Sequence, residues 1–255
     1  MPQLNFVQEG AGPLIVFSHA LGCDLSMWDS VAALLRERHT VLRYDARGHG
    51  KSERVPGPYS MDALADDAAE LIGRHGKGPV NFVGLSMGGM TAQSLAARHP
   101  ALVQRIVIAN SAACYDEAAR AGWDVRIATV HSQGMSGVSE GAMQRWFTPG
   151  FRADERGAAC VAVQRAQLES CDPASYAASC VAVRNIDFRQ SNPRIACPAL
   201  VIAGKWDEAT PPALSESIAQ SIPGARLRTI DASHLSAIER PAEFAALVAE
   251  FIETS

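Results

Sequence analysis

The sequence lacks several patterns that define whole classes of protein. No apolar run in its 255 residues approaches the roughly 18 residues of a membrane-spanning helix. The opening residues, MPQLNFVQEGAGP, have neither the basic start nor the long apolar core of an export signal, which predicts a cytoplasmic protein. No stretch is rich in Lys or Arg and the formal net charge is −4, so neither nucleic acid nor a membrane is an expected partner.

Cysteine spacing is equally uninformative about metals. No C-x-x-C motif occurs, and such motifs are the usual sequence signal for zinc, so no metal site is expected. Without an export signal the thiols are expected to be reduced and buried as small apolar side chains. The six cysteines are Cys23, Cys114, Cys160, Cys171, Cys180 and Cys197.

Short apolar runs alternate with amphipathic stretches through the first 110 residues. Hydrophobic residues make up 47% of the chain and charged residues 20%, which is typical of a globular protein. Alternation of buried strands with helices predicts an α/β fold, a mostly parallel central sheet flanked by helices. The expected strands here are residues 4–8 (an edge strand), 14–19, 39–45, 79–85 and 105–110, and one expected helix is 61–74.

The alternation stops at about residue 113. From there to about 190 no strand-like run appears, and apolar residues fall at helical spacing. We therefore expect a core of residues 1–112 and 191–255 with a helical cap, 113–190, inserted in it. Within the cap the richest helical stretches are 155–169 and 173–185, and after it come strands at 198–204 and 225–231 and helices at 211–221 and 241–253.

The stretch 79–99 contains the clearest chemical signal. An apolar strand is followed at once by Ser86 and then by an Ala-rich helix, with Gly84, Ser86 and Gly88 in the pattern G-x-S-x-G. A nucleophile on such a sharp turn needs small neighbours, because strand and helix must pass closely. Ser86 is thus the expected nucleophile. The alternative is a serine that only caps the helix.

A serine hydroxyl needs a base to take its proton and an acid to orient that base. In this type of fold the order along the chain is nucleophile, acid, base. His234 lies between an expected strand and the last helix, and Asp207 follows the strand before it, so they are the expected base and acid. Asp231 and Asp187 are the weaker candidates for the acid; Asp231 ends its own strand and is expected to cap the turn.

A tetrahedral oxyanion needs two fixed N–H donors. The residue after the nucleophile, Met87, is expected to supply one. The loop HALG after an early strand is expected to supply the other through Leu21. His19 is expected to shape that loop and not to transfer protons.

Several segments carry a resemblance that spans nearly the whole chain. YDARGHG and GLSMGG occur across many α/β-hydrolases, whereas the cap segments and GKWDEATP are more discriminating. On these segments the chain resembles the α/β-hydrolases and, within them, the 3-oxoadipate enol-lactonases of aromatic-compound catabolism (the β-ketoadipate pathway). One departure is Ala20, where many α/β-hydrolases have glycine. The segments are SHALGCDLSMW (18–28), LRYDARGHGKS (42–52), GLSMGGMTAQSLAARHP (84–100), RWFTPGF (145–151), SYAASCVAVRNIDFR (175–189), ALVIAGKWDEATPP (199–212) and DASHLSAIERP (231–241).

The resemblance implies a serine hydrolase that opens 3-oxoadipate enol-lactone to 3-oxoadipate through an acyl-enzyme. It maps the nucleophile to Ser86, the acid to Asp207 and the base to His234, and it implies no metal or organic cofactor. The implied partner is a small anionic lactone, so the cap should offer a cation. Arg145 beside Trp146 is the candidate, as a planar donor fork next to a flat apolar wall. The alternative is an arginine on the solvated face of its helix.

Two other functions stay open at this stage. One is the hydrolysis of another small carboxylic ester or lactone by the same three residues, since the cap sets the substrate. The other is a slow-turnover ligand receptor with a hydrolase fold. The sequence does not predict the oligomeric state.

Overall fold

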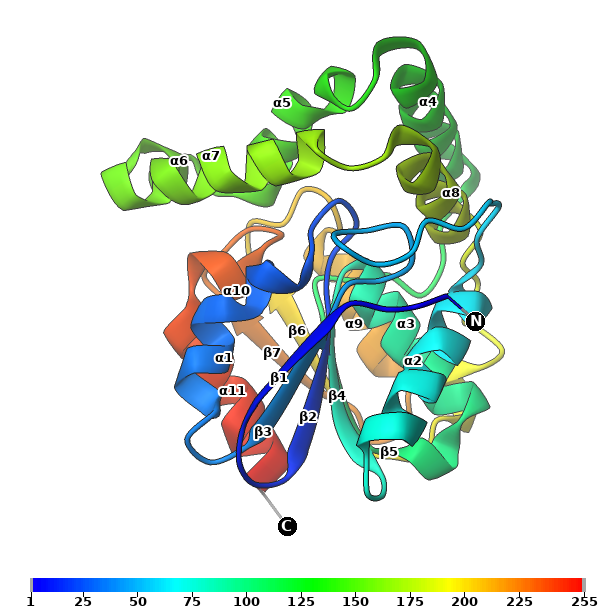
Figure 1. The fold of residues 1–255 in the computed structure, drawn as a ribbon, viewed down its shortest axis with the longest axis vertical. Helices are drawn as coiled ribbons and strands as arrows, with labels where there is room; N and C mark the ends of the chain where they lie inside the picture. The colour runs from blue at the N-terminus through cyan, green and yellow to red at the C-terminus, as the bar shows by residue number, and fades with distance from the viewer. Residues whose placement is uncertain (1, 254–255) are drawn as a thin grey trace.

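One seven-stranded sheet organises residues 2–253, the part of the chain that the computed structural model describes (Figure 1). β1 pairs antiparallel with β3, and the other neighbours pair in parallel. The mostly parallel sheet expected from the alternating apolar runs is confirmed. In sheet order the strands are β1 (Phe6–Gly10), β3 (Thr40–Tyr44), β2 (Leu14–Ser18), β4 (Val80–Leu85), β5 (Val103–Ala109), β6 (Ala199–Gly204) and β7 (Arg226–Ile230).

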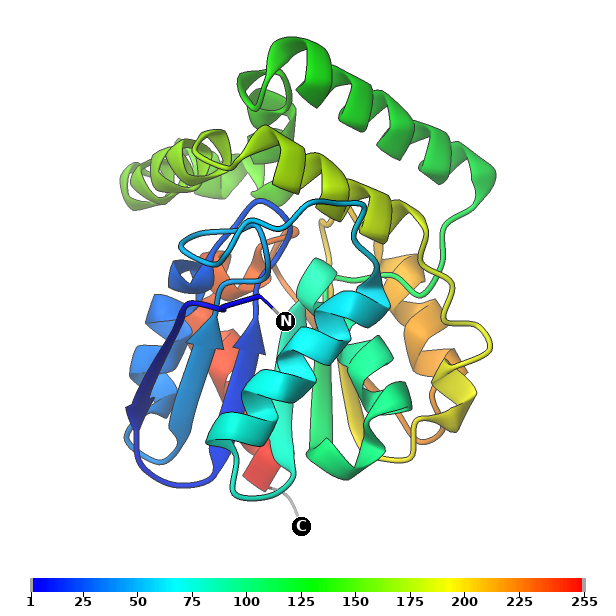
Figure 2. The same cartoon turned by 45° about the vertical axis from the view of Figure 1, so that its right-hand side comes forward.

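Helices cover both faces of this sheet (Figures 1 and 2). On one face lie α1 (Asp29–Leu35) and α11 (Pro241–Glu253). On the other lie α2 (Met61–His75), α3 (Met87–Arg98) and α9 (Pro212–Ser221). Four short helices complete the core: η1 (Leu25–Trp28), η2 (Pro100–Leu102), η3 (Asn192–Arg194) and α10 (Ser236–Glu239).

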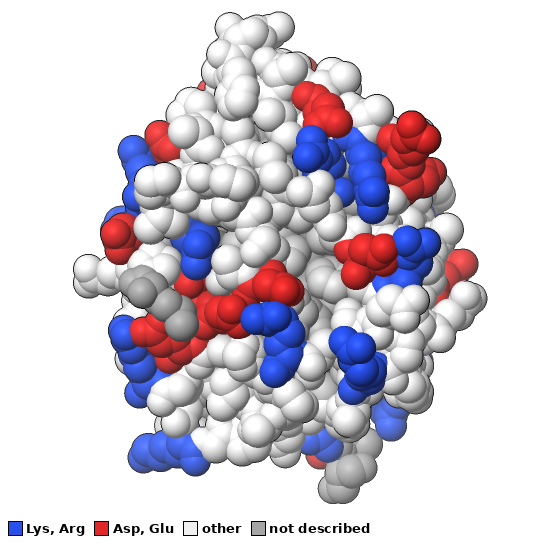
Figure 3. Space-filling view, turned by 90° about the vertical axis from the view of Figure 1, so that its right-hand side faces the viewer, with Lys and Arg blue, Asp and Glu red and all other residues white. Residues whose placement is uncertain are grey.

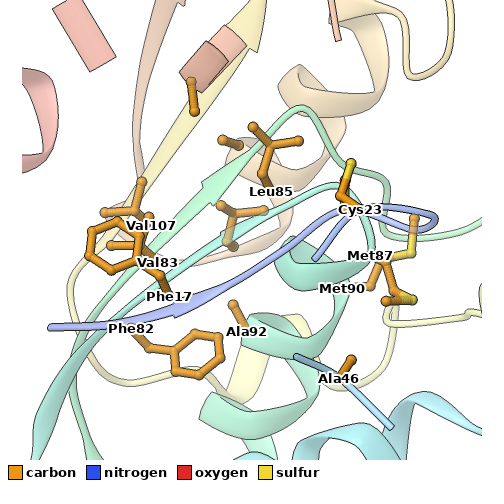
Figure 4. Close-up of a cluster of buried hydrophobic side chains, with 14 of the residues drawn as sticks. Phe17, Cys23, Ala46, Phe82, Val83, Leu85, Met87, Met90, Ala92 and Val107 are labelled. Carbon is orange, nitrogen blue, oxygen red and sulfur yellow. The ribbon is translucent and has the colours of Figure 1, made fainter. Parts of the chain in front are cut away.

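The core packs against both faces of the central strands. Phe17 is paired with Val83, and Val83 with Val107, across three parallel strands, so these side chains share one face. Phe82 points the other way and lies beside Ala92 of α3 (Figure 4). All five are at most 1% exposed. Burial of each large apolar side chain contributes roughly 1.5–3 kcal/mol, and the carboxyl ends of the strands are thereby held in register.

Five further helices are inserted between β5 and β6. These inserted helices lie over the edge of the sheet where the parallel strands end (Figures 1 and 2). The expected helical stretches 155–169 and 173–185 coincide with two of them, whereas the shortest, α6, was not expected. It forms because Thr148 accepts a hydrogen bond from the Phe151 N–H and proline follows at the first helical position. The inserted helices are α4 (Glu117–Gln133), α5 (Ser136–Trp146), α6 (Pro149–Ala153), α7 (Glu155–Glu169) and α8 (Pro173–Arg184).

The expectation that all six cysteines are buried was wrong. Cys23 and Cys180 are buried, three others are partly buried, and Cys160 on α7 is exposed. Cys160 lies on α7, which packs against the rest of the protein on one side only. The other side of this helix, where Cys160 lies, is exposed to solvent. The described cysteines are free thiols.

Acidic and basic side chains lie next to one another on the face shown in Figure 3, and no extended basic patch covers that face. Within residues 2–253, none of the helices combines the length and the apolar character needed to cross a bilayer.

Candidate active site

Ser86 lies in a strained turn between β4 and α3. Its φ is 57° and its ψ is −114°, a conformation that residues other than glycine rarely adopt. A Cβ on Gly84 would lie 2.0 Å from the Gly88 oxygen, and a Cβ on Gly88 would lie 2.0 Å from the Ser18 oxygen. Both glycines are therefore required by the close passage of strand and helix. The Ser86 N–H donates to the Ala109 oxygen at 2.8 Å, which ties the turn to β5.

Asp207 and His234 meet at the same edge of the sheet. Asp207 follows β6 and His234 follows β7, and both side chains are buried. The His234 Nδ1 and Asp207 Oδ2 atoms lie 2.9 Å apart. This contact joins two residues far apart in the sequence because the strands before them are parallel neighbours.

Four further donors hold the Asp207 carboxylate. The backbone N–H groups of Ala209 and Thr210 donate to Oδ1, both at 2.8 Å. Thr210 Oγ1 and Asn110 Nδ2 donate to Oδ2, at 2.7 and 3.0 Å. Burial raises the pKa of Asp207, but the charge of His234 and these hydrogen bonds lower it by more, so the pKa lies below the usual aspartate value.

An ionised Asp207 can only accept hydrogen bonds. The proton between the two side chains therefore belongs to His234 Nδ1, and His234 Nε2 is left as an acceptor. That is the tautomer a general base needs. Asn110 and Thr210, which fix the carboxylate, were not identified from the sequence. Asn110 directly follows β5, and its φ of 48° is positive like that of Ser86.

The two other acid candidates lie elsewhere. Asp231 does not cap its turn as expected; its Oδ1 accepts from the Trp206 indole N–H at 2.8 Å. Asp187 pairs with Arg189 at 2.7 Å. Neither carboxylate lines the pocket described next.

A pocket of about 500 Å³ lies between the edge of the sheet and the inserted helices. Ser86, His234 and Leu21 line it from the core side. Within residues 2–253, Ser86 Oγ makes no hydrogen bond to protein, so the hydroxyl is available to a ligand. From the side of α4, α5 and their flanks the pocket is lined by Tyr115, Ala119, Gly122, Trp123, Val125, Arg126, Thr129, Gly137, Val138, Gly141, Arg145 and Trp146.

The two residues expected to supply oxyanion donors lie near Ser86 in different ways: Met87 follows it in the chain, and Leu21 lines the same pocket. Met87 is the first residue of α3, so its N–H has no partner within the helix. Leu21 lies in a turn closed by a 3.1 Å hydrogen bond from Cys23 N to the Ala20 oxygen. Gly22 has a φ of 78°, as the third residue of a type II turn requires. Neither the Leu21 nor the Met87 N–H donates to another group among the described residues.

Arg145 and Trp146 both line the pocket, and a second arginine joins them. Arg126 on α4 lies with its guanidinium over the Trp123 ring, 5.2 Å from the centroid. In the described part of the chain, neither arginine has a carboxylate within ion-pair distance. Burial lowers the pKa of Arg145, and the charge of Arg126 lowers it further. Two neighbouring cations that form no direct ion pair favour binding of an anion, although the charge of Glu208, which also lines the pocket, raises the pKa of Arg145.

No sequence signal pointed to Arg126. It lies on a helix whose spacing looks like that of any amphipathic helix, and only the packing of α4 places this residue in the pocket that Ser86 lines. Among residues 2–253 there is no group of three or more His, Cys, Asp or Glu side chains arranged to hold a metal ion.

Comparisons with known proteins agree with this geometry. The family model described as "alpha/beta hydrolase fold" matches residues 13–241. The chain is 36% identical to 3-oxoadipate enol-lactonase 2 of Acinetobacter baylyi, over 94% of this chain and 90% of that protein. It is 33% identical to 3-oxoadipate enol-lactonase 1 of the same organism, over 95% and 89%.

A solved structure shares the whole fold. The crystal structure of the enol-lactonase from Burkholderia xenovorans LB400 superposes with a TM-score of 0.94 and 38% sequence identity, covering 99% of this chain and 97% of that one. The match includes the inserted helices as well as the sheet. Together these findings support an ester or lactone hydrolase. The chain belongs to the α/β-hydrolase fold family and, within it, to the family of the 3-oxoadipate enol-lactonases.

Proposed function

We propose that this protein hydrolyses 3-oxoadipate enol-lactone to 3-oxoadipate, a step in the catabolism of aromatic compounds. The observation that carries the proposal is one pocket that joins Ser86 and His234 to Arg126 and Arg145. The substrate has one group for each pair of residues. An ester carbonyl within its ring can react with Ser86 and His234, and its one carboxylate can bind to Arg126 and Arg145. The relatives named as 3-oxoadipate enol-lactonases support the choice of this lactone.

Ser86, His234 and Asp207 form the catalytic triad. Ser86 Oγ attacks the lactone carbonyl while His234 Nε2 takes its proton, and Asp207 stabilises the imidazolium. The N–H groups of Leu21 and Met87 donate to the developing oxyanion. When the intermediate collapses, the ring C–O bond breaks. The departing enolate oxygen takes the proton from His234 and stays attached through the acyl chain.

The second half of the reaction restores Ser86. His234 removes a proton from water, which attacks the acyl carbonyl, and Ser86 leaves with that proton. The free enol then tautomerises to the ketone. Since opening the ring creates a second carboxylate, the product carries one more negative charge than the substrate.

Residues 113–190 form a cap on a core made of residues 1–112 and 191–255. The cap supplies the substrate-binding groups: Arg126 and Arg145 hold the carboxylate and Trp146 packs against the ring. The pocket supports these roles, because Ser86 and His234 line it from loops at the strand ends and the opposite wall comes from α4 and α5.

Steady-state turnover tests the proposal. Loss of the ultraviolet absorbance of 3-oxoadipate enol-lactone is measured beside hydrolysis of a simple aryl acetate. We expect the lactone to have the much higher kcat/KM. Slow lactone turnover with brisk aryl-acetate hydrolysis would mean another small ester or lactone as substrate, and activity on neither would favour a ligand receptor.

Removing either pocket arginine should weaken lactone binding selectively. We expect Arg145→Gln and Arg126→Gln each to raise KM for the lactone about 10-fold or more, since a hydrogen bond to a charged group contributes roughly 1.5–3 kcal/mol. The kcat for the lactone should change little. Hydrolysis of a neutral aryl acetate should be unaffected, because that substrate has no carboxylate to hold.

Arg120→Gln is the matched control for these two variants. Arg120 is on the same helix as Arg126 but is exposed and outside the pocket. Its KM for the lactone should equal that of the wild type. Unchanged KM in both pocket variants would show that the substrate carboxylate binds elsewhere.

A further inference from the structure

His49 is a buried histidine that takes no part in the triad. It lies in the glycine turn after β3 and is 1% exposed. Its ring lies 5.1 Å from that of His19, which is also fully buried. Two histidines buried side by side are unusual, because burial disfavours their charged forms and each polar atom then needs a partner.

Hydrogen bonds connect His49 directly to the turn that contains Leu21. The Gly22 N–H donates to His49 Nε2 at 3.3 Å, across 27 positions in the sequence. On its other side, His49 Nδ1 donates to the Arg47 oxygen at 3.2 Å. The Arg47 side chain is in turn held by a bidentate ion pair with Asp67, at 2.6 and 2.7 Å.

Only the neutral form of His49 can make this bridge. Burial, together with the neighbouring His19, lowers the pKa of His49 to about 3, so the ring is neutral at ordinary pH. With the proton on Nδ1, the Nε2 lone pair faces the Gly22 N–H. A protonated ring would place two donors against each other there.

The hydrogen bond from Gly22 to His49 also affects the neighbouring peptide group, which carries the Leu21 N–H. In the turn from Ala20 to Cys23, the Gly22 N–H is bonded to His49 while the Leu21 N–H is left without a partner in residues 2–253. An oxyanion donor stabilises the transition state only if it is held in place beforehand. Helix α7 packs closely against the same turn, since a Cβ on Gly22 would lie 2.5 Å from Leu168 Cδ1.

We propose that His49 is a positioning residue for the oxyanion hole: its Nε2 holds the Gly22 N–H, and this bond aims the Leu21 N–H at the oxygen of the carbonyl group that Ser86 attacks. The proposal rests on the serine chemistry of the proposed function but not on the identity of the lactone. It can therefore be tested with a simple aryl ester.

A matched pair of variants separates the hydrogen bond from packing. In His49→Gln, the side-chain amide extends to the place of Nε2, so its oxygen can accept from the Gly22 N–H. In His49→Asn, the amide ends near the place of Nδ1, so it can reach the Arg47 oxygen but not Gly22. His131→Asn, on an exposed position of α4, is the control for histidine loss.

Three measurements are made on each variant: kcat and KM for 4-nitrophenyl acetate, the inhibition constant of phenylboronic acid, and Tm. The boron atom bonds to Ser86 Oγ as the serine proton passes to His234, and the resulting tetrahedral adduct places an oxygen in the oxyanion hole. For His49→Asn we expect kcat to fall about 10-fold or more with KM unchanged, a smaller loss than the ~10²–10³-fold that follows deletion of a donor. The inhibition constant should rise by a similar factor.

We expect His49→Gln to retain most of the activity and of the boronic acid affinity, and His131→Asn to match the wild type. Wild-type kcat and boronic acid affinity in His49→Asn, whatever its Tm, would overturn the proposal. Equal losses of activity in the Asn and Gln variants, with Tm lowered in both, would also overturn it and leave His49 a packing residue. If the wild type hydrolyses the aryl ester but not the enol-lactone, the proposed substrate fails while this test stands.

Discussion

Ser86→Ala should reduce kcat/KM for the enol-lactone by about 10⁵- to 10⁶-fold, the scale seen when the nucleophile of a serine triad is removed. The hydroxyl is the only group of Ser86 that the variant lacks, and it makes no hydrogen bond within residues 2–253. The fold should therefore persist. The positive φ that presents the side chain is a property of the turn, which is held by the bond from Ser86 N to Ala109 and by Gly84 and Gly88.

Binding distinguishes loss of chemistry from loss of structure in this variant. Ser86→Ala should bind the product 3-oxoadipate with wild-type affinity, measured by calorimetry on both proteins, because Arg126 and Arg145 are intact. It should also keep its Tm. The informative control is Ser132→Ala, an exposed serine of α4 whose loss should leave kcat/KM unchanged. Measurable turnover by purified Ser86→Ala, above that of the buffer, would mean that another residue is the nucleophile.

Asp207→Asn should be the second most damaging change, with kcat lowered by about 10³- to 10⁴-fold. The carboxylate accepts from Ala209 and Thr210 on one oxygen and from Thr210, Asn110 and His234 on the other. An amide side chain has one oxygen and one NH₂ group, so it cannot accept hydrogen bonds at both positions. If its oxygen faces the backbone N–H groups, its NH₂ donates to His234 Nδ1 and fixes the wrong tautomer. If it turns around, its NH₂ meets two N–H donors.

Asp231→Asn is the matched control for that change. It alters the same chemical group three positions before His234, at a carboxylate whose one donor among residues 2–253 is the Trp206 indole N–H. Its kcat for the lactone or for an aryl acetate should equal that of the wild type. The reverse pattern, with Asp231→Asn impaired and Asp207→Asn active, would reassign the acid.

The residues proposed to be catalytic were expected from the sequence because their order is a property of the chain. In a parallel sheet the residues just after each strand share one edge, and so the ends of β4, β6 and β7 bring Ser86, Asp207 and His234 together. Strand boundaries were less well determined. β1 spans Phe6–Gly10 and not 4–8, because its last residue pairs with Thr40 at the start of β3.

Little in the sequence pointed to the side chains that only support the site. Asn110 and Thr210 are polar residues at a strand end and in a loop, positions where such residues are common. Their role depends on which way each side chain turns once the strands are paired. His49 is similar: its sequence context, a glycine turn, does not indicate that its ring reaches a turn 27 residues away.

By itself, then, the sequence determined the α/β architecture, the inserted helical segment and the three residues expected to carry the chemistry. These features follow from hydrophobic periodicity and from the order of elements along the chain. Both can be read from short segments, such as one strand and the turn after it. The tertiary structure alone decided that Arg126 joins Arg145 in the pocket lined by Ser86. Arg126 and Arg145 lie on separate helices, and whether both point into one pocket depends on the angle at which α4 and α5 pack over the sheet. That angle is set by the sum of many weak apolar contacts and has no local sequence pattern.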